Sequence, residues 1–208
     1  MIFNIILAKN SFQVYTHRVS IESKHSRLSP EYVLMGFLYQ HPGHGYDLHK
    51  QLSEEFGYIW HVSQSQTYNI LKRLEAKGFI TSTAIEQVKL PNRQLLHLTE
   101  TGIQRFNAWL ETPTQCSVHT IRVEFITRLY FLQHYQPQRV QDVIRTQINE
   151  VEMGLHRLDE IRTILPEDQA FNHLALDLRI KLLRSIFTWL DECRDKFTSN
   201  ELTKDEYN

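Results

Sequence analysis

Four side chains in one short stretch carry groups that can bind nucleic acid: Ser65, Tyr68, Asn69 and Lys72. At about 100° per residue they fall on one side of a helix, with Arg73 beside them. Lys and Arg pair with phosphate or guanine, and Asn can pair with adenine, so this face has the chemistry to enter a DNA major groove. The opposite side carries residues suited to a core: Thr67, Ile70, Leu71 and Leu74.

The ends of this helix can be predicted, and so can the elements that follow it. Ser63 with Gln66 three residues later is a capping-box pattern, and Gly78 is a usual residue just after a helix. Residues 79–85 and 93–98 then read as strands around a turn at 86–92. This order predicts a winged helix. Lys89 and Arg93 near the wing tip, together with Arg73, would contact phosphates, as would Ser63 and the first amides of the helix.

Two further helices are predicted before the helix that starts after Ser63, which would be the recognition helix of the winged helix. Ser29-Pro30 is a good start for the first, which runs to about Gln40, and residues 41–45 read as a turn before a helix that ends near Phe56. His44 and Tyr46 begin that second helix and could contact the DNA backbone. The alternative, which the sequence supports equally, is that His44 is an ordinary loop residue and Tyr46 a core residue. The spacing of the nearby histidines does not suit a metal site, so we expect no metal.

Composition limits the function classes. The chain has 208 residues, 41% hydrophobic, and a net charge of −1, which suits one medium or two small folded domains and argues against general polyanion binding. Cys116 and Cys193 are far apart, so we expect reduced thiols, and we find neither a membrane span nor a signal peptide. No catalytic or cofactor motif is present. We therefore expect a cytoplasmic protein that is not an enzyme and has no cofactor.

Several segments resemble the PadR family of bacterial transcriptional regulators. They are G-H-G-Y-D-L at 43–48, S-x-x-x-x-Y-x-x-L-x-R-L-E-x-x-G-F-I at 63–80, L-T-E-x-G at 98–102 and R-x-E-F-x-x-R-L-Y-F at 122–131. The resemblance covers about residues 29–197. It departs from many relatives at Gln64, Ser65 and Asn69, where Pro, Gly and Pro are usual, and in a wing with only Lys89 and Arg93 as cations.

The C-terminal half reads as long helices: residues 118–135, then from Pro137 to about Leu165, and from about Asp168 to Phe197. Apolar stripes follow the last two at helical spacing, marginally meeting the coiled-coil pattern. One interpretation is an antiparallel helix pair within the chain; the other, which the resemblance favours, is a homodimer interface. The predicted interface residues are Ile144, Ile148, Val151, Leu155, Leu158, Leu165, Leu178, Leu182 and Trp189.

The predicted fold is mainly α with a small β wing: an extension (1–28), a winged helix-turn-helix domain (29–112) and an antiparallel, coiled-coil-like dimerisation domain (113–208). The extension is open to three interpretations: a DNA-contacting arm, an element packed on the domain, or the product of an upstream start codon. The expected function is a homodimeric repressor that binds double-stranded operator DNA, an inverted repeat, and occludes a promoter. The alternative is a winged-helix adaptor that binds only protein. Some members of the family release DNA on binding small aromatic molecules, so the resemblance raises the same role here, with Trp109, Phe125, Tyr130, Phe131 and Trp189 as candidate lining residues. The alternative, and the usual role of aromatic residues at helical spacing, is that they belong to the core.

Overall fold

The computed structural model describes residues 30–85 and 93–198. The winged helix begins with α2 (Glu31–Gln40), α3 (Gly45–Phe56) and α4 (Gln64–Ala76). A three-stranded antiparallel sheet follows in the order β1-β3-β2. The interpretations of residues 1–28 and of the turn at 86–92 fall outside the described residues, and so does Lys89.

The sheet contains a strand that the sequence did not predict. Strands β2 (Ile80–Ile85) and β3 (Arg93–Leu98) pair as expected for a wing. The segment expected to be a turn contributes β1 (Gly43–His44), whose residues pair with Leu96 and Leu95 of β3. This short strand ties the start of α3 to the base of the wing, because α3 begins at the next residue.

Helix α5 (Glu100–Glu111) returns the chain from the wing to the core. The hydroxyl of Thr99 accepts a hydrogen bond from the Gly102 amide at 3.1 Å and so caps the helix. A Cβ on Gly102 would lie 2.1 Å from the carbonyl oxygen of Phe79, so only glycine allows α5 to start this close to β2.

The core of the winged helix is an aromatic cluster. The buried rings of Phe37, Phe56 and Phe106 each lie 5.4–5.9 Å from the ring of Phe131, between ring centroids. Phe131 belongs to α7 (Ile126–Tyr135), so this later helix completes the core that α2, α3 and α5 begin. A Cβ on Gly36 would lie 2.3 Å from the Phe131 ring, which shows how closely α2 and α7 approach.

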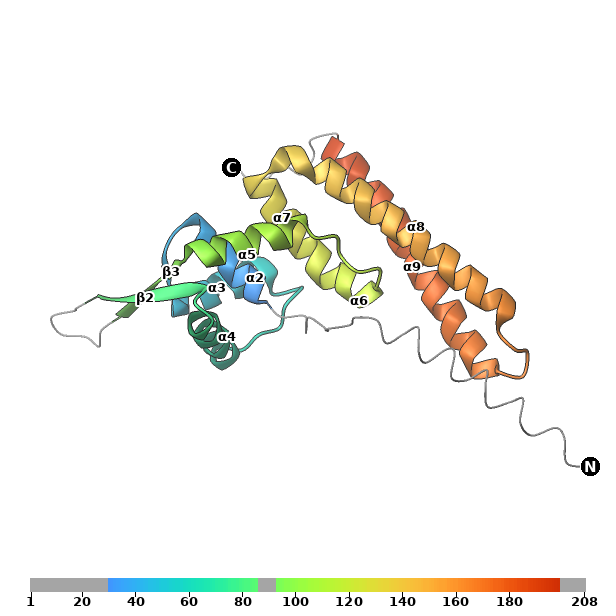
Figure 1. Cartoon of the computed structure of the whole chain (residues 1–208), viewed down its shortest axis with the longest axis horizontal. Helices are drawn as coiled ribbons and strands as arrows, with labels where there is room; N and C mark the ends of the chain where they lie inside the picture. Colours follow the sequence, from blue (N-terminus) through green and yellow to red (C-terminus); the bar gives the residue numbers. More distant parts are fainter. Residues whose placement is uncertain (1–29, 86–92, 199–208) are drawn as a thin grey trace, which may run out of the picture.

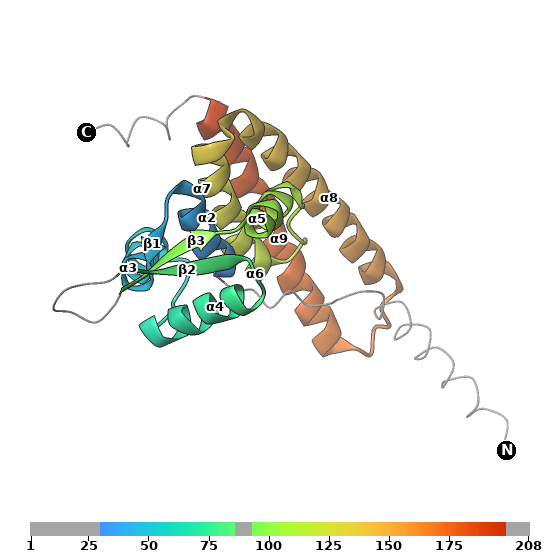
Figure 2. The same cartoon turned by 60° about the vertical axis from the view of Figure 1, so that its left-hand side comes forward.

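The helix expected at residues 118–135 is present and contains an irregularity. It consists of α6 (Val118–Thr120), the π-helical turn η1 (Ile121–Phe125) and α7, which follow one another without a break. A single 3-10 turn, η2 (Pro137–Arg139), leads to α8 (Val140–Ile164), and α9 (Ala170–Thr198) runs back along it. We call α8 and α9 the arm; Figures 1 and 2 show it projecting from the winged helix as an antiparallel pair.

The stripe of α8 that suggested a dimer interface lies mostly inside the chain. Ile144, Ile148, Val151 and Leu158 are 0–8% exposed, while Leu155 and Leu165 are half-buried. The alternative interpretation, an antiparallel pair within one chain, therefore accounts for the stripe of α8. A heptad pattern reports that a helix face is covered but not which chain covers it. The remaining predicted residues are on α9: Trp189 is half-buried, whereas Leu178 and Leu182 are 58% and 42% exposed.

Candidate nucleic-acid interface

Helix α4 is fixed at both ends by the residues that the sequence indicated. The Ser63 hydroxyl accepts from the Gln66 amide at 3.3 Å, and the Gln66 side chain accepts from the Ser63 amide at 2.8 Å, which completes the capping box. After the helix, Gly78 has φ = +72°, a conformation that glycine adopts without strain. The register of α4, and therefore which face it exposes, is set by these local bonds together with burial.

The two faces of α4 divide as predicted. Thr67, Ile70, Leu71 and Leu74 are buried, at 0–6% exposure. The exposed residues are Ser65, Asn69, Lys72, Arg73 and Tyr68, the last 46% exposed. Thr67 is the one polar residue on the inner face, and its hydroxyl bonds to the Ser63 carbonyl and to Nδ1 of His49 on α3. The inner face anchors the helix and leaves the polar face open to solvent.

A groove of about 760 Å³ runs along the exposed face, between α4, the start of α3 and the sheet. It brings together five of the predicted residues from separate parts of the chain: His44, Tyr46, Tyr68, Asn69 and Lys72. Figure 2 shows α4 and the wing strands on the side of the winged helix away from α8. The groove therefore gathers amide, hydroxyl and cationic groups on a surface that the arm does not cover.

Histidine 44 is tied to the wing. Its Nδ1 lies 2.8 Å from the main-chain oxygen of Gln94 on β3. Because a carbonyl only accepts, Nδ1 carries the proton of this bond, and Nε2 is the nitrogen left to contact a ligand. His44 is thus a strand residue bonded to the sheet rather than a free loop histidine. Tyr46 is 58% exposed, so the interpretation as a core tyrosine was wrong.

The ring of Tyr68 is held against the start of α3. A Cβ on Gly45 would lie 2.8 Å from Cε1 of Tyr68 and 3.3 Å from Cδ1 of Leu71. The absence of a side chain at Gly45 therefore creates the place that Tyr68 occupies. The tyrosine is a positioned part of the groove.

Three groove residues were missed from the sequence. Gln94 on β3 is exposed at the groove, and Asp47 and Glu75 place two carboxylates in the same groove as Lys72. Glu75 is turned toward the wing, because its carboxylate accepts a hydrogen bond from the Ser82 hydroxyl of β2 at 2.6 Å. Alternation along β3 places Gln94 on the same face as Leu96, but only the folded sheet shows that this face borders the groove along α4.

The predicted phosphate contacts on the wing are only partly described. Arg93 is the first residue of β3, where its main chain pairs with Ile85 of β2. Arg73 is exposed in the last turn of α4. The role of Lys89 and of the wing tip stays a prediction.

The five aromatic residues considered for an effector each pack against another aromatic ring. Trp109 stacks on Tyr32 at 4.5 Å, Phe131 and its neighbour Tyr130 pack in the aromatic core, and Phe125 meets Trp189 edge-on at 6.5 Å. Trp109, Phe125 and Phe131 are buried core residues, while Tyr130 and Trp189 are half-buried and pack against that core. A hollow of about 170 Å³ does lie where the arm meets the winged helix, but its lining is mainly polar.

Titratable groups in the described regions offer no other obvious site. No group of three His, Cys, Asp or Glu residues there is placed to hold a metal, and no helix there is long and apolar enough to cross a membrane. Cys116 and Cys193 are free thiols. Burial raises the pKa of both, that of Cys193 to about 11, so neither is activated as a nucleophile.

Comparison with known proteins identifies the family. Residues 34–108 match the model of the transcriptional regulator PadR-like family, and residues 121–198 match the model named virulence activator alpha C-term. The negative transcriptional regulator PadR of Bacillus subtilis is 32% identical over 129 residues, 62% of this chain and 70% of that protein.

Solved structures of the same Bacillus subtilis protein are also similar. Its complex with operator DNA is 25% identical, covering 80% of this chain and 98% of that one, with a TM-score of 0.40. Its complex with p-coumaric acid is 25% identical over 81% and 98% of the two chains, with a TM-score of 0.37. The family match decides between the two functions expected from the sequence, in favour of a DNA-binding regulator over a protein-binding adaptor. This chain belongs to the PadR-like family of transcriptional regulators.

Proposed function

We propose that this regulator is a homodimeric repressor that binds an inverted-repeat operator through α4 and the wing and so occludes a promoter. The observation that supports it most is the groove along α4, where polar side chains from three elements and the ammonium group of Lys72 line one surface. A protein-docking surface would need apolar anchors there. Besides the two exposed tyrosines, the apolar residues that line this groove are Leu71 and Leu96, and both belong to the core.

The residues of the groove divide by role. Ser65, Tyr68, Asn69 and Lys72 point outward from α4 and would face base edges, with Asn69 suited to adenine and Lys72 to guanine or phosphate. Ser63, Arg73 and Arg93 would position the protein on phosphates, as would Lys89 in the wing. His44 and Tyr46 would contact the backbone that flanks the groove, with Nε2 of His44 as the donor or acceptor.

The proposed dimer surface is the outer face of α9. Phe171, Leu174, Leu178 and Leu182 are spaced by three or four residues and are 86%, 66%, 58% and 42% exposed. Such a row of large apolar side chains is unusual on a monomer and is covered when two copies pair. The two-fold symmetry of a dimer would present two copies of α4 to half-sites about 34–36 Å apart or a multiple of that distance.

The remaining expectations follow from the role of a promoter-binding regulator. We propose that the chain acts in the cytoplasm, where a bacterial promoter is accessible, and that it has no catalytic activity. An aromatic effector stays a prediction for this chain: of the residues considered for it, Trp109, Phe125 and Phe131 are buried in the core.

The mode of action is tested by footprinting and transcription in vitro on a promoter that contains the operator. A repressor is expected to protect DNA that overlaps the polymerase site and to lower the amount of transcript as protein is added. Protection upstream of that site with more transcript would make the protein an activator. Sedimentation of the free protein at the same concentrations reports whether the species that binds is a dimer.

A further inference from the structure

Buried polar side chains concentrate where the arm joins the winged helix. Among the described residues, the buried polar or charged ones are Thr67, Thr114, Thr127, Arg128 and Gln147. Three of them, Thr114, Arg128 and Gln147, lie at this junction, between the end of α5, the linker after it, α7 and α8, while Thr127 of α7 bonds to Trp60 on the winged-helix side. A buried polar group loses its hydration and must be paired, so a cluster of them specifies one geometry more strictly than an apolar contact of the same size.

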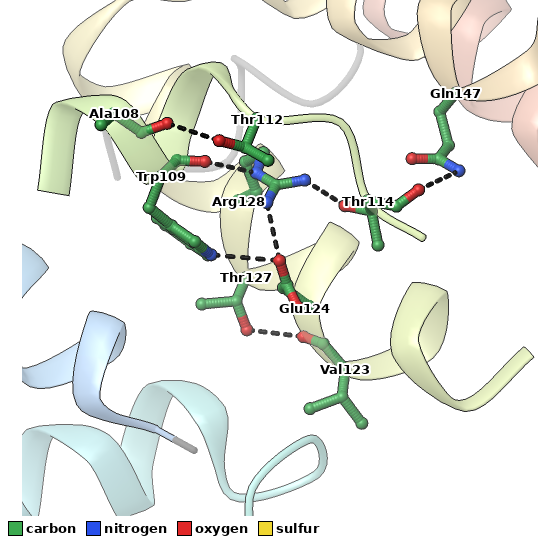
Figure 3. A network of polar contacts seen from close by, with 9 residues as sticks. All are labelled: Ala108, Trp109, Thr112, Thr114, Val123, Glu124, Thr127, Arg128 and Gln147. Carbon is green, nitrogen blue, oxygen red and sulfur yellow. Dashed lines mark hydrogen bonds and ion pairs between the residues drawn. The ribbon is translucent and has the colours of Figure 1, made fainter. Parts of the chain in front are cut away.

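Thr114, in the linker, is held from two sides (Figure 3). Its hydroxyl accepts a hydrogen bond from the Arg128 guanidinium of α7. Its main-chain oxygen accepts from Nε2 of Gln147 on α8, at 3.2 Å. The three residues are 1–2% exposed. One linker residue is thus bonded both to the helix that completes the core of the winged helix and to the arm. We call these three residues the junction clamp.

Arg128 is itself fixed in place. Its Nε donates to the Trp109 carbonyl at 3.1 Å, at the end of α5, and its Nη2 donates to Glu124 at 2.7 Å. The Glu124 carboxylate also accepts from the Trp109 indole at 3.2 Å, and the guanidinium lies 5.0 Å from the centre of that ring. A guanidinium with donors in a rigid fork and partners on several sides cannot rotate to follow a moving linker.

Helix α7 in turn is bonded to the elements that carry the recognition helix. The Thr127 hydroxyl accepts from the Trp60 indole at 3.0 Å, three residues before the cap of α4, and Tyr130 donates to Glu55 at the end of α3. Tyr135 donates to the Gly36 carbonyl of α2 at 2.7 Å. Helix α7 is therefore part of one rigid unit with the winged helix, and the clamp sets the direction in which the arm leaves that unit.

We propose that the junction clamp of Thr114, Arg128 and Gln147 determines the half-site spacing that the dimer accepts, by fixing the angle between the winged helix and the arm. The proposal rests on the proposed dimeric function, in which α9 joins the two copies. The residues act as positioning residues and touch no DNA. One base pair of added spacing rotates a half-site by about 35° around the DNA axis, so a dimer with a fixed angle rejects it, whereas a dimer with a loose junction tolerates it.

The test uses full-length protein and duplexes that carry the operator at its natural spacing, with one base pair added or removed, and as a single half-site. Gln147→Met removes the donor to Thr114 at nearly constant volume, and Thr114→Val separately removes the acceptor of Arg128. Thr146→Val is the matched control, because the Thr146 hydroxyl bonds to Asp142 within α8 and leaves the clamp intact. Affinities come from anisotropy titrations, and dimerisation from sedimentation.

Wild type and Thr146→Val are expected to prefer the natural spacing by about tenfold or more, and each clamp variant to reduce that preference to within about threefold, a change on the scale of one lost hydrogen bond. Half-site affinity and dimerisation should stay at wild-type values. Full retention of the spacing preference in both variants would overturn the proposal. A loss confined to half-site affinity or to dimerisation would also overturn it, because the clamp would then stabilise a single domain rather than set the angle between two. If wild type neither dimerises nor recognises an inverted repeat, the proposed function fails, whatever the variants do.

Discussion

The ring of Tyr68 lies over Gly45 so closely that a Cβ at the glycine would come within 2.8 Å of the ring. The first residue of α3 and the exposed tyrosine of α4 are therefore fitted to each other, and the groove between these helices has the shape that this contact sets. The tyrosine that we propose to face DNA is in this way positioned by a residue that has no side chain.

Gly45→Ala should weaken operator binding without unfolding the protein. The new methyl group pushes Tyr68 out of its place, while alanine is well tolerated by helical backbone. We expect a loss of about tenfold in affinity, near 1.4 kcal/mol, in anisotropy titrations. Gly43→Ala is the control, because its Cβ would only make ordinary contact with Leu48, 3.4 Å away. Unchanged affinity in Gly45→Ala would remove Tyr68 from the interface.

Asn69→Ala should lower affinity for the operator but not for random DNA. The amide of Asn69 is exposed on α4 and suits adenine, so its loss is expected to cost about 1–3 kcal/mol on the cognate site. Competition titrations with operator and random duplexes measure the two affinities side by side. An equal loss on both would mean that Asn69 contacts the backbone and reads no base.

Arg73→Ala should weaken binding to every sequence alike. A phosphate contact releases a counterion, so its removal is expected to reduce the slope of log affinity against log salt by about 0.9. Arg145→Ala on α8 is the matched control, because it makes the same change of charge on a helix that contributes no residue to the groove. If the two variants give the same slope, Arg73 makes no phosphate contact.

Leu178→Glu with Leu182→Glu should give folded monomers. Both side chains are exposed in the single chain, so charge there costs little folding energy but opposes pairing across the outer face of α9. By contrast, Val151→Glu should unfold the arm, since a charge would replace a residue with no exposure. Sedimentation and thermal unfolding separate the two outcomes. A double variant that remains dimeric would place the interface on another surface.

Local rules were enough to predict the recognition helix. Ser63, Gln66 and Gly78 fix the backbone of residues next to them, so these residue types alone predicted the ends of α4. The spacing of its apolar residues predicted which face is buried and which is exposed. The order of helices and wing strands followed in the same way. The mainly α fold with its wing and antiparallel C-terminal pair was therefore confirmed.

Prediction from the sequence failed where a residue's structure depends on partners that lie far away in the chain. Gly43 and His44 become a strand only because β3 lies beside them, fifty residues later, and in isolation their neighbours read as a turn. The apolar face of α8 that contains Val151 has the same sequence pattern whether α9 of the same chain or another chain covers it. Arg128 sits in a motif of the family, but a charged residue on a helix is usually exposed, so its burial in the junction clamp could not be foreseen.

Selection of bound fragments from random DNA, followed by anisotropy titrations at two salt concentrations, tests the central claim most directly. We expect recovery of an inverted repeat, bound by one dimer about 10³-fold or more tighter than random DNA and with an affinity that falls steeply with salt. Recovery of no enriched motif, or of a single half-site bound by a monomer, would contradict a dimeric, sequence-specific repressor.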